Sequence, residues 1–146
     1  MINLITRTLL ALTLVAGFAG AASAQELIAN GVRVEPKPLA ATDPLAVRAS
    51  ALVKHILAGE KDAAVALLQK EADPAYAKSD KLVTDVEAHI KRLSTAKYSI
   101  SDFQTGIGSD VVVLLTGEKG LEENIVIRFN EAKRMTGFAN LKINRG

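Results

Sequence analysis

The 146-residue sequence predicts an α+β domain with N-terminal helices packed on an antiparallel four-stranded meander. Three observations predict this class. Apolar residues recur at helical spacing between residues 43 and 95. After Thr95 the spacing changes to the alternation of strands, and short turns separate these strands. Strands joined by short turns pair antiparallel, and helices that precede them pack on one face of their sheet.

Residues 1–24 are predicted to be a secretory signal peptide. Arg7 is the only charged residue of this segment, and the apolar run that follows is short for a membrane span. Ala22-Ser23-Ala24 has the small-x-small form after which signal peptidase cleaves. We therefore expect cleavage between Ala24 and Gln25 and a periplasmic or secreted protein; the alternative is an uncleaved membrane anchor.

Residues 25–42 are predicted to be either a mobile N-terminal arm or a short hairpin. Asn30-Gly31 lies between two short apolar segments, which is typical of a two-residue hairpin turn. Two prolines, Pro36 and Pro38, then favour an extended linker. Residues 43–146 form the single α+β domain of this prediction.

Three helices are predicted at the start of that domain. Asp43 is a suitable N-cap with Pro44 at the first helical position, and Gly59 ends this first helix. A second, shorter helix is expected from Asp62 to about residue 73, before a proline. The third begins at Ser79, and its expected apolar stripe is Leu82, Val83, Val86, Ile90 and Leu93.

Four strands follow, over residues 98–103, 111–115, 125–129 and 135–143, with a bulge expected near Gly137. A two-residue turn at Glu118-Lys119 would place Val112 opposite Ile125. The expected helix-facing side of the two central strands is then Val112, Leu114, Ile125 and Ile127. The expected outer side is Val111, Val113, Leu115, Val126 and Arg128.

This outer side is too apolar to be left in contact with water, and no element of the sequence is assigned to cover it. Unless residues 25–42 fold over it, it predicts a homodimer interface formed by Val111, Val113, Leu115, Val126 and Arg128.

The composition excludes several classes of protein. The sequence contains no cysteine, so disulfide frameworks and thiolate chemistry are excluded. A formal net charge of +2 with no basic stripe speaks against nucleic-acid binding. The two histidines are not arranged in a metal-ligand motif, so no metal or other cofactor is expected. No membrane contact is expected after signal cleavage.

Residues able to carry out catalysis or ligand binding are few. His89 lies at the edge of the third helix's apolar stripe, and Asp85 precedes it by one turn. Such a pair could hold an imidazole in one tautomer, as a general base requires, or could be a half-buried structural pair. Tyr98 could point into a pocket or only pack, and His55 is expected to face solvent.

The order of a capped helix, a short helix, a third helix and a meander, ending in the segment from Ile125 to Phe138, resembles the nuclear transport factor 2-like superfamily. The resemblance is to its small exported bacterial members of unknown function. It implies a cystatin-like cone, in which a curved sheet wraps around the helices. Members commonly use the cone as a pocket, and many dimerise through the outer face of the sheet.

Three functions are compatible with these observations. One is an exported module without catalysis that binds a small apolar ligand or another protein. A second is a structural accessory domain of an envelope complex. The third is a small isomerase- or cyclase-type enzyme that uses His89 and Asp85.

Overall fold

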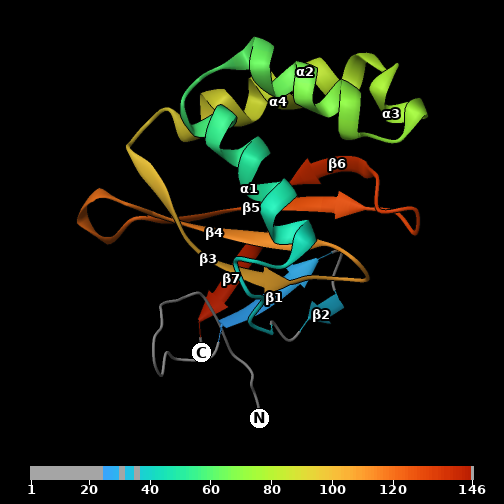
Figure 1. Ribbon diagram of the computed structural model, residues 1–146. Helices are drawn as coiled ribbons and strands as arrows, with labels where there is room; N and C mark the ends of the chain where they lie inside the picture. The colour runs from blue at the N-terminus through green and yellow to red at the C-terminus, as the bar shows by residue number, and fades with distance from the viewer. Residues whose placement is uncertain (1–24, 30–31, 35–36, 146) are drawn as a thin grey trace.

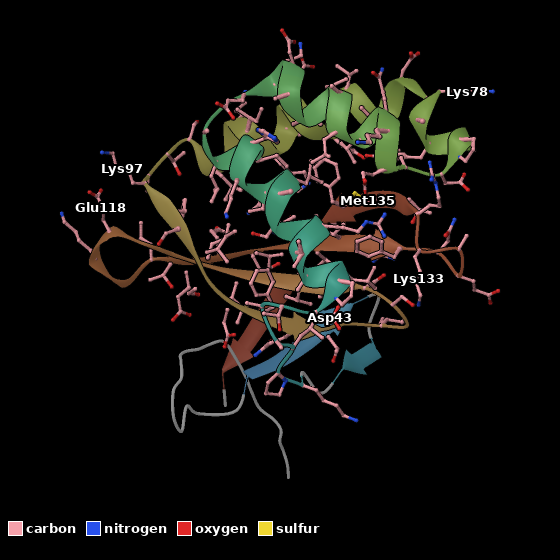
Figure 2. All side chains as sticks on the ribbon, viewed as in Figure 1. Asp43, Lys78, Lys97, Glu118, Lys133 and Met135 are labelled. Atoms are coloured by element: carbon pink, nitrogen blue, oxygen red, sulfur yellow. The ribbon has the colours of Figure 1, made fainter. Side chains whose placement is uncertain are left out.

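The computed structural model describes residues 25–29, 32–34 and 37–145, with side chains for residues 37–141. The predicted signal peptide and the Asn30-Gly31 turn lie outside the described residues. The described elements form three layers: helices, a four-stranded sheet and a three-stranded sheet (Figure 1). Side chains fill the space between α1 and the four-stranded sheet (Figure 2).

The helical layer comprises α1 (Pro44–Leu57), α2 (Lys61–Glu71), α3 (Pro74–Ala77) and α4 (Asp80–Leu93). The prediction for α1 is confirmed, because the Asp43 carboxylate accepts the N–H of Leu45 at 2.9 Å and Pro44 opens the helix. α2 begins one residue before the expected cap, Asp62. α3 was not predicted: Asp73 caps a further short helix instead of only ending the second one.

The four-stranded sheet is an open antiparallel meander in the order β3-β4-β5-β6. Its strands are β3 (Tyr98–Thr105), β4 (Val111–Gly117), β5 (Glu122–Phe129) and β6 (Met135–Ala139). The α+β class is therefore confirmed. The expected bulge is also present, because the register between β5 and β6 shifts where Phe129 pairs with Met135 and Arg128 with Gly137.

The predicted register between β4 and β5 is wrong by one residue. Val112 pairs with Val126, not with Ile125. Four residues separate the strands, and the Gly117 N–H donates to the Leu121 carbonyl at 2.7 Å, so the turn itself holds three residues, Glu118–Gly120, rather than two. Lys119 and Gly120 both take a left-handed backbone, with φ 58° and +75°. A two-residue turn would instead need a positive φ at Glu118 and Lys119. The three-residue turn moves one of the two left-handed positions from Glu118 to a glycine, which adopts it without a steric penalty.

A slip of one residue reverses the faces of one strand relative to the other. The β5 prediction is confirmed, since Ile125, Ile127 and Phe129 lie in the core beneath the helices. The β4 prediction is wrong, and its helix-facing residues are Val111, Val113 and Leu115. On the outer face, Val112 of β4 packs with Val126 of β5.

The three-stranded sheet has the order β2-β1-β7 and comprises β1 (Gln25–Ala29), β2 (Val32–Val34) and β7 (Lys142–Arg145). β1 and β2 pair antiparallel, which corresponds to the hairpin alternative for residues 25–42. Two strands thus precede the first helix, and the order of helices before strands holds only from Asp43 onward. The expected last strand, 135–143, is divided between β6 and β7, which belong to different sheets.

The centre of the outer face of the four-stranded sheet is buried within the chain, whereas Ser99, Asp102 and Thr116, on the β3 side of this face, are exposed. Val112 and Val126 are 0% and 1% exposed, and Leu114 and Leu141 pack against them. Figure 1 shows β1 and β7 on the side of the sheet away from α1. The chain enters β7 beside Asn124, whose side-chain amide donates to the Leu141 carbonyl at 2.8 Å and accepts the Leu141 N–H at 2.9 Å.

Candidate functional site

His89 of α4 lies between the helices and β6 and is 9% exposed. Its ring packs against Phe138 with a centroid distance of 4.7 Å. Its Nδ1 lies 3.1 Å from Arg92 Nη2. Because a guanidinium can only donate, Nδ1 is the acceptor and the neutral ring carries its proton on Nε2. The His89 ring also forms a hydrogen bond with the backbone of Phe138.

The His89 imidazole is held in its neutral form. Burial, followed by the nearby Arg92 charge, lowers the pKa of His89 to about 4, although Asp85 and the Phe138 backbone oppose this shift. A general base that takes a proton near pH 7 needs a pKa close to that pH. The surroundings of His89 therefore suit a structural imidazole better than a catalytic one.

Arg92 joins α4 to β5. Its Nη1 donates to Glu123 Oε1 at 2.6 Å, and its Nη2 donates to the Asn124 carbonyl at 3.0 Å as well as to His89. We call His89, Arg92, Glu123 and the Phe138 backbone the α4–sheet junction. Its members come from α4, β5 and β6, and the predicted residue His89 is at its centre.

Asp85 shares a face of α4 with His89 but directs its carboxylate elsewhere. Asp85 Oδ2 accepts from the Tyr76 hydroxyl at 2.8 Å and from Lys81 Nζ at 2.7 Å. Burial, and then the hydrogen bond with Asp85, raises the pKa of Tyr76. Asp85 and His89 thus lie near one another, but the Asp85 carboxylate binds Tyr76 and so links α3 to α4.

Tyr98 lies elsewhere, at the start of β3 and opposite Gly117 in the register. A Cβ at Gly117 would come within 2.9 Å of the Tyr98 ring, so the tyrosine packs closely on the backbone of the β4–β5 hairpin. His55 is near the end of α1, where its Nδ1 lies 2.8 Å from Glu60 Oε1, partly open to solvent as expected.

The five residues expected to form an outer interface are split between the two faces of the sheet. Val111, Val113 and Leu115 are buried against the helices, because of the one-residue change in register. Val126 does lie on the outer face, where it is buried within the chain. Arg128 is half-buried. Burial of Asp110 raises the pKa of that carboxyl group, and the nearby Arg128 charge opposes this shift.

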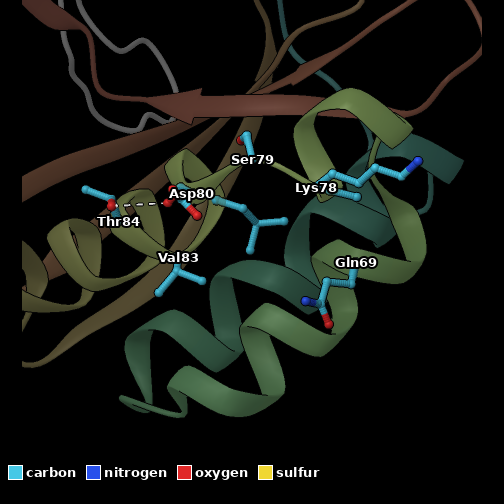
Figure 3. A pocket seen from close by; sticks show the side chains of 8 residues that line it. Gln69, Lys78, Ser79, Asp80, Val83 and Thr84 are labelled. Carbon is cyan, nitrogen blue, oxygen red and sulfur yellow. Dashed lines mark hydrogen bonds between the residues drawn. The ribbon is translucent and has the colours of Figure 1, made fainter.

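An open pocket of about 460 Å³ lies where α2, α3 and α4 meet (Figure 3). Gln69 reaches it from α2, Lys78 and Ser79 from the link between α3 and α4, and Val83 from α4. The other residues that line it are Ala77, Asp80, Leu82 and Thr84. In Figure 3, the Thr84 hydroxyl donates to the Asp80 carbonyl at 3.2 Å.

Sequence reasoning missed this pocket because it depends on α3, a four-residue helix without a periodic pattern of its own. Val83 was expected in the apolar stripe of α4, but it is 37% exposed at the pocket. The one sequence signal for α3 is Asp73-Pro74, because this pair is a favourable start for a helix as well as an end for the helix before it.

Among the residues that the structure describes, no group of three or more histidine, aspartate or glutamate side chains is placed to hold a metal ion. Within the same residues, no helix has both the length and the apolar character needed to cross a bilayer.

Comparison with protein-family models, with curated proteins and with solved structures gives no match to the chain. The architecture and the local chemistry described above are therefore the basis for a functional proposal.

Proposed function

We propose that the chain is an exported binding module that takes up a small ligand in the pocket between α2, α3 and α4 and does not catalyse a reaction. The observation that carries this proposal is the pocket itself. Its volume of about 460 Å³ falls in the range of small-molecule sites, about 300–1,000 Å³. Its lining combines the charged Lys78 and Asp80 with the apolar Ala77 and Val83, so it could bind both the polar and the apolar part of a ligand.

The surroundings of His89 and Asp85 support a role without catalysis. Both side chains are already engaged by protein groups: Arg92 and the Phe138 backbone for His89, and Tyr76 and Lys81 for Asp85. The pocket is lined by other residues. A ligand bound there would therefore meet the outer surface of the helices rather than the buried imidazole.

The structural-accessory alternative depended on an exposed apolar sheet face. Since Val112 and Val126 of that face are buried within the chain, the face does not favour this alternative. A homodimer stays a prediction. We also propose membership of the nuclear transport factor 2-like superfamily with its cystatin-like cone; this is supported by helices packed on one face of a four-stranded antiparallel meander.

The binding proposal can be tested with two matched valine variants. Val83 lines the pocket, whereas Val47 is a similarly exposed valine on α1. In an NMR screen of a fragment library against residues 25–146, we expect bound fragments to shift the amides of Gln69 and residues 77–84. Val83→Arg should abolish these shifts, because its long side chain fills the pocket, whereas Val47→Arg should leave them unchanged.

Fragments that bind equally well to the Val83→Arg protein would contradict the proposed site. A substrate that the protein turns over, with turnover lost in His89→Gln but retained in Val83→Arg, would favour the enzyme alternative instead.

Export is a separate proposal. Cleavage after Ala24 would leave β1 intact, because this strand begins at Gln25. When the full chain is expressed in a Gram-negative host, N-terminal sequencing of protein from the periplasmic fraction should begin at Gln25. Protein recovered with Met1 intact and only from the cytoplasm would show that residues 1–24 are not an export signal.

A further inference from the structure

The α4–sheet junction contains a buried histidine that receives a hydrogen bond from a permanent cation. We propose that this junction is an acid-sensitive latch, in which protonation of His89 releases the C-terminal half of α4 from the edge strand β6. This inference does not depend on the binding pocket, which shares no residue with the junction.

The geometry of the ring determines the effect of the proton. In the neutral ring, Nδ1 accepts from Arg92 Nη2 at 3.1 Å, and Phe138 supplies a backbone partner. Protonation occurs at Nδ1, after which both ring nitrogens donate. Arg92 has only donors and keeps its charge, so the hydrogen bond becomes a contact between two N–H groups that carry like charges.

Arg92 has little freedom to turn away while α4 stays in place. It donates to Glu123 Oε1 at 2.6 Å and to the Asn124 carbonyl at 3.0 Å, which fix the guanidinium beside β5. His89 is also confined, because its ring packs on Phe138. His89 and Arg92 both belong to α4, so the repulsion is relieved when this end of the helix leaves the sheet: Arg92 then loses Glu123 and the Asn124 carbonyl, and the two cationic side chains can separate in water.

The other charged groups around His89 do not cancel this effect. On α4, Asp85 favours the protonated ring and Lys81 opposes it, and the two form an ion pair with each other at 2.7 Å. From α3, Tyr76 donates to Asp85 rather than to His89. From β5, Glu123 is already bound to Arg92, and β6 contributes the Phe138 backbone.

The pH range follows from the pKa of His89, which the junction lowers from 6.5 to about 4. Well above pH 6.5 the ring is neutral whether the junction is open or closed, so the closed state keeps its full stability. As the pH falls from 6.5 towards 4, an opened ring in contact with water binds a proton and the closed one does not. The equilibrium therefore shifts towards the open state, by about 60-fold between pH 7 and pH 4.5.

Opening would uncover one part of β6. Near its start, β6 is held by other contacts, because the Met135 carbonyl accepts from the Asp73 N–H at 2.8 Å and Arg134 donates to the Ala72 carbonyl. Phe138, near its end, is covered by His89. The latch would thus free the end of an edge strand while its start stays attached to the link between α2 and α3.

Hydrogen exchange with two histidine variants tests the latch. His89→Gln keeps a side chain that can accept from Arg92 and donate to the Phe138 backbone but cannot be protonated, whereas His55→Gln is the control at the other histidine. Between pH 7 and pH 4.5, protection factors of amides in residues 89–93 and 137–139 should fall about 60-fold in the parent protein and in His55→Gln. They should fall far less in His89→Gln, and amides at the centre of β4 should stay protected.

An equal loss of protection in His89→Gln would overturn the latch, and so would an equal loss at every amide of the parent protein. If His89→Gln does not fold at pH 7, Arg92→Gln provides the test. Removing this cation should raise the pKa of His89, measured by NMR titration of its ring protons. An unchanged pKa in Arg92→Gln would also overturn the proposal.

Discussion

Replacing Ile127 by alanine should lower the free energy of unfolding by about 2–5 kcal/mol. Ile127 is 0% exposed and lies in the core between the four-stranded sheet and the helices. The change removes buried apolar surface and leaves a cavity that the neighbours Val111 and Phe138, which pair with it across the sheet, cannot fully close. Urea denaturation monitored by circular dichroism gives the value.

Ile107→Ala is the matched control, because Ile107 is an isoleucine exposed in the β3–β4 turn. The same truncation there should change stability by less than about 0.5 kcal/mol. A loss below about 1 kcal/mol for Ile127→Ala would mean that this side of β5 is not the core side.

Replacing Val113 by lysine should prevent stable folding, with a loss of roughly 4 kcal/mol or more. Val113 is fully buried on the helix side of β4, so its replacement would place an ammonium group in the core without a partner. The register predicted from a two-residue turn places Val113 on the outer face, at the expected dimer interface. It therefore predicts that Val113→Lys folds but no longer dimerises. The Glu118–Gly120 connection excludes that geometry.

Val47→Lys is the control for this substitution, since Val47 is 53% exposed on α1. We expect this variant to keep the circular dichroism spectrum and the urea midpoint of the parent protein. A Val113→Lys protein that remains folded and changes only its sedimentation would support the sequence-based register over that of the structure.

Structural features that depend on a few neighbouring residues could be predicted from the sequence. Asp43 and Pro44 mark the start of α1 through a hydrogen bond that forms within two residues, and the broken alternation at Gly137 marks a bulge. The faces of β4 could not be obtained in the same way. They depend on whether Gly120 or Glu118 takes the second left-handed position beside Lys119, and a difference of one residue reverses a whole strand.

The site was predictable only in part, for a related reason. The spacing of Asp85 and His89 correctly places them on one side of α4, but their partners come from distant segments. Glu123 and Asn124, which fix Arg92 beside His89, are 31 and 32 residues away from Arg92 in the sequence. The Tyr76 hydroxyl donates to the Asp85 carboxylate, and Tyr76 belongs to the four-residue helix α3, which is too short to show a helical pattern of apolar residues.

Asn124 gives β5 a means of rejecting incorrect alignments. It is buried on the outer face, and its amide pairs with both backbone groups of Leu141 as another strand would. If β5 were turned over by a slip of one residue, this amide would enter the apolar core opposite the helices and lose both partners, at a cost of about 1–3 kcal/mol for each unpaired group. Arg128 alternates onto the same face of β5 as Asn124, so the same slip would also bring its charge to the helix side. Two polar side chains, an amide and a guanidinium, thus favour one of the two ways of assembling the sheet.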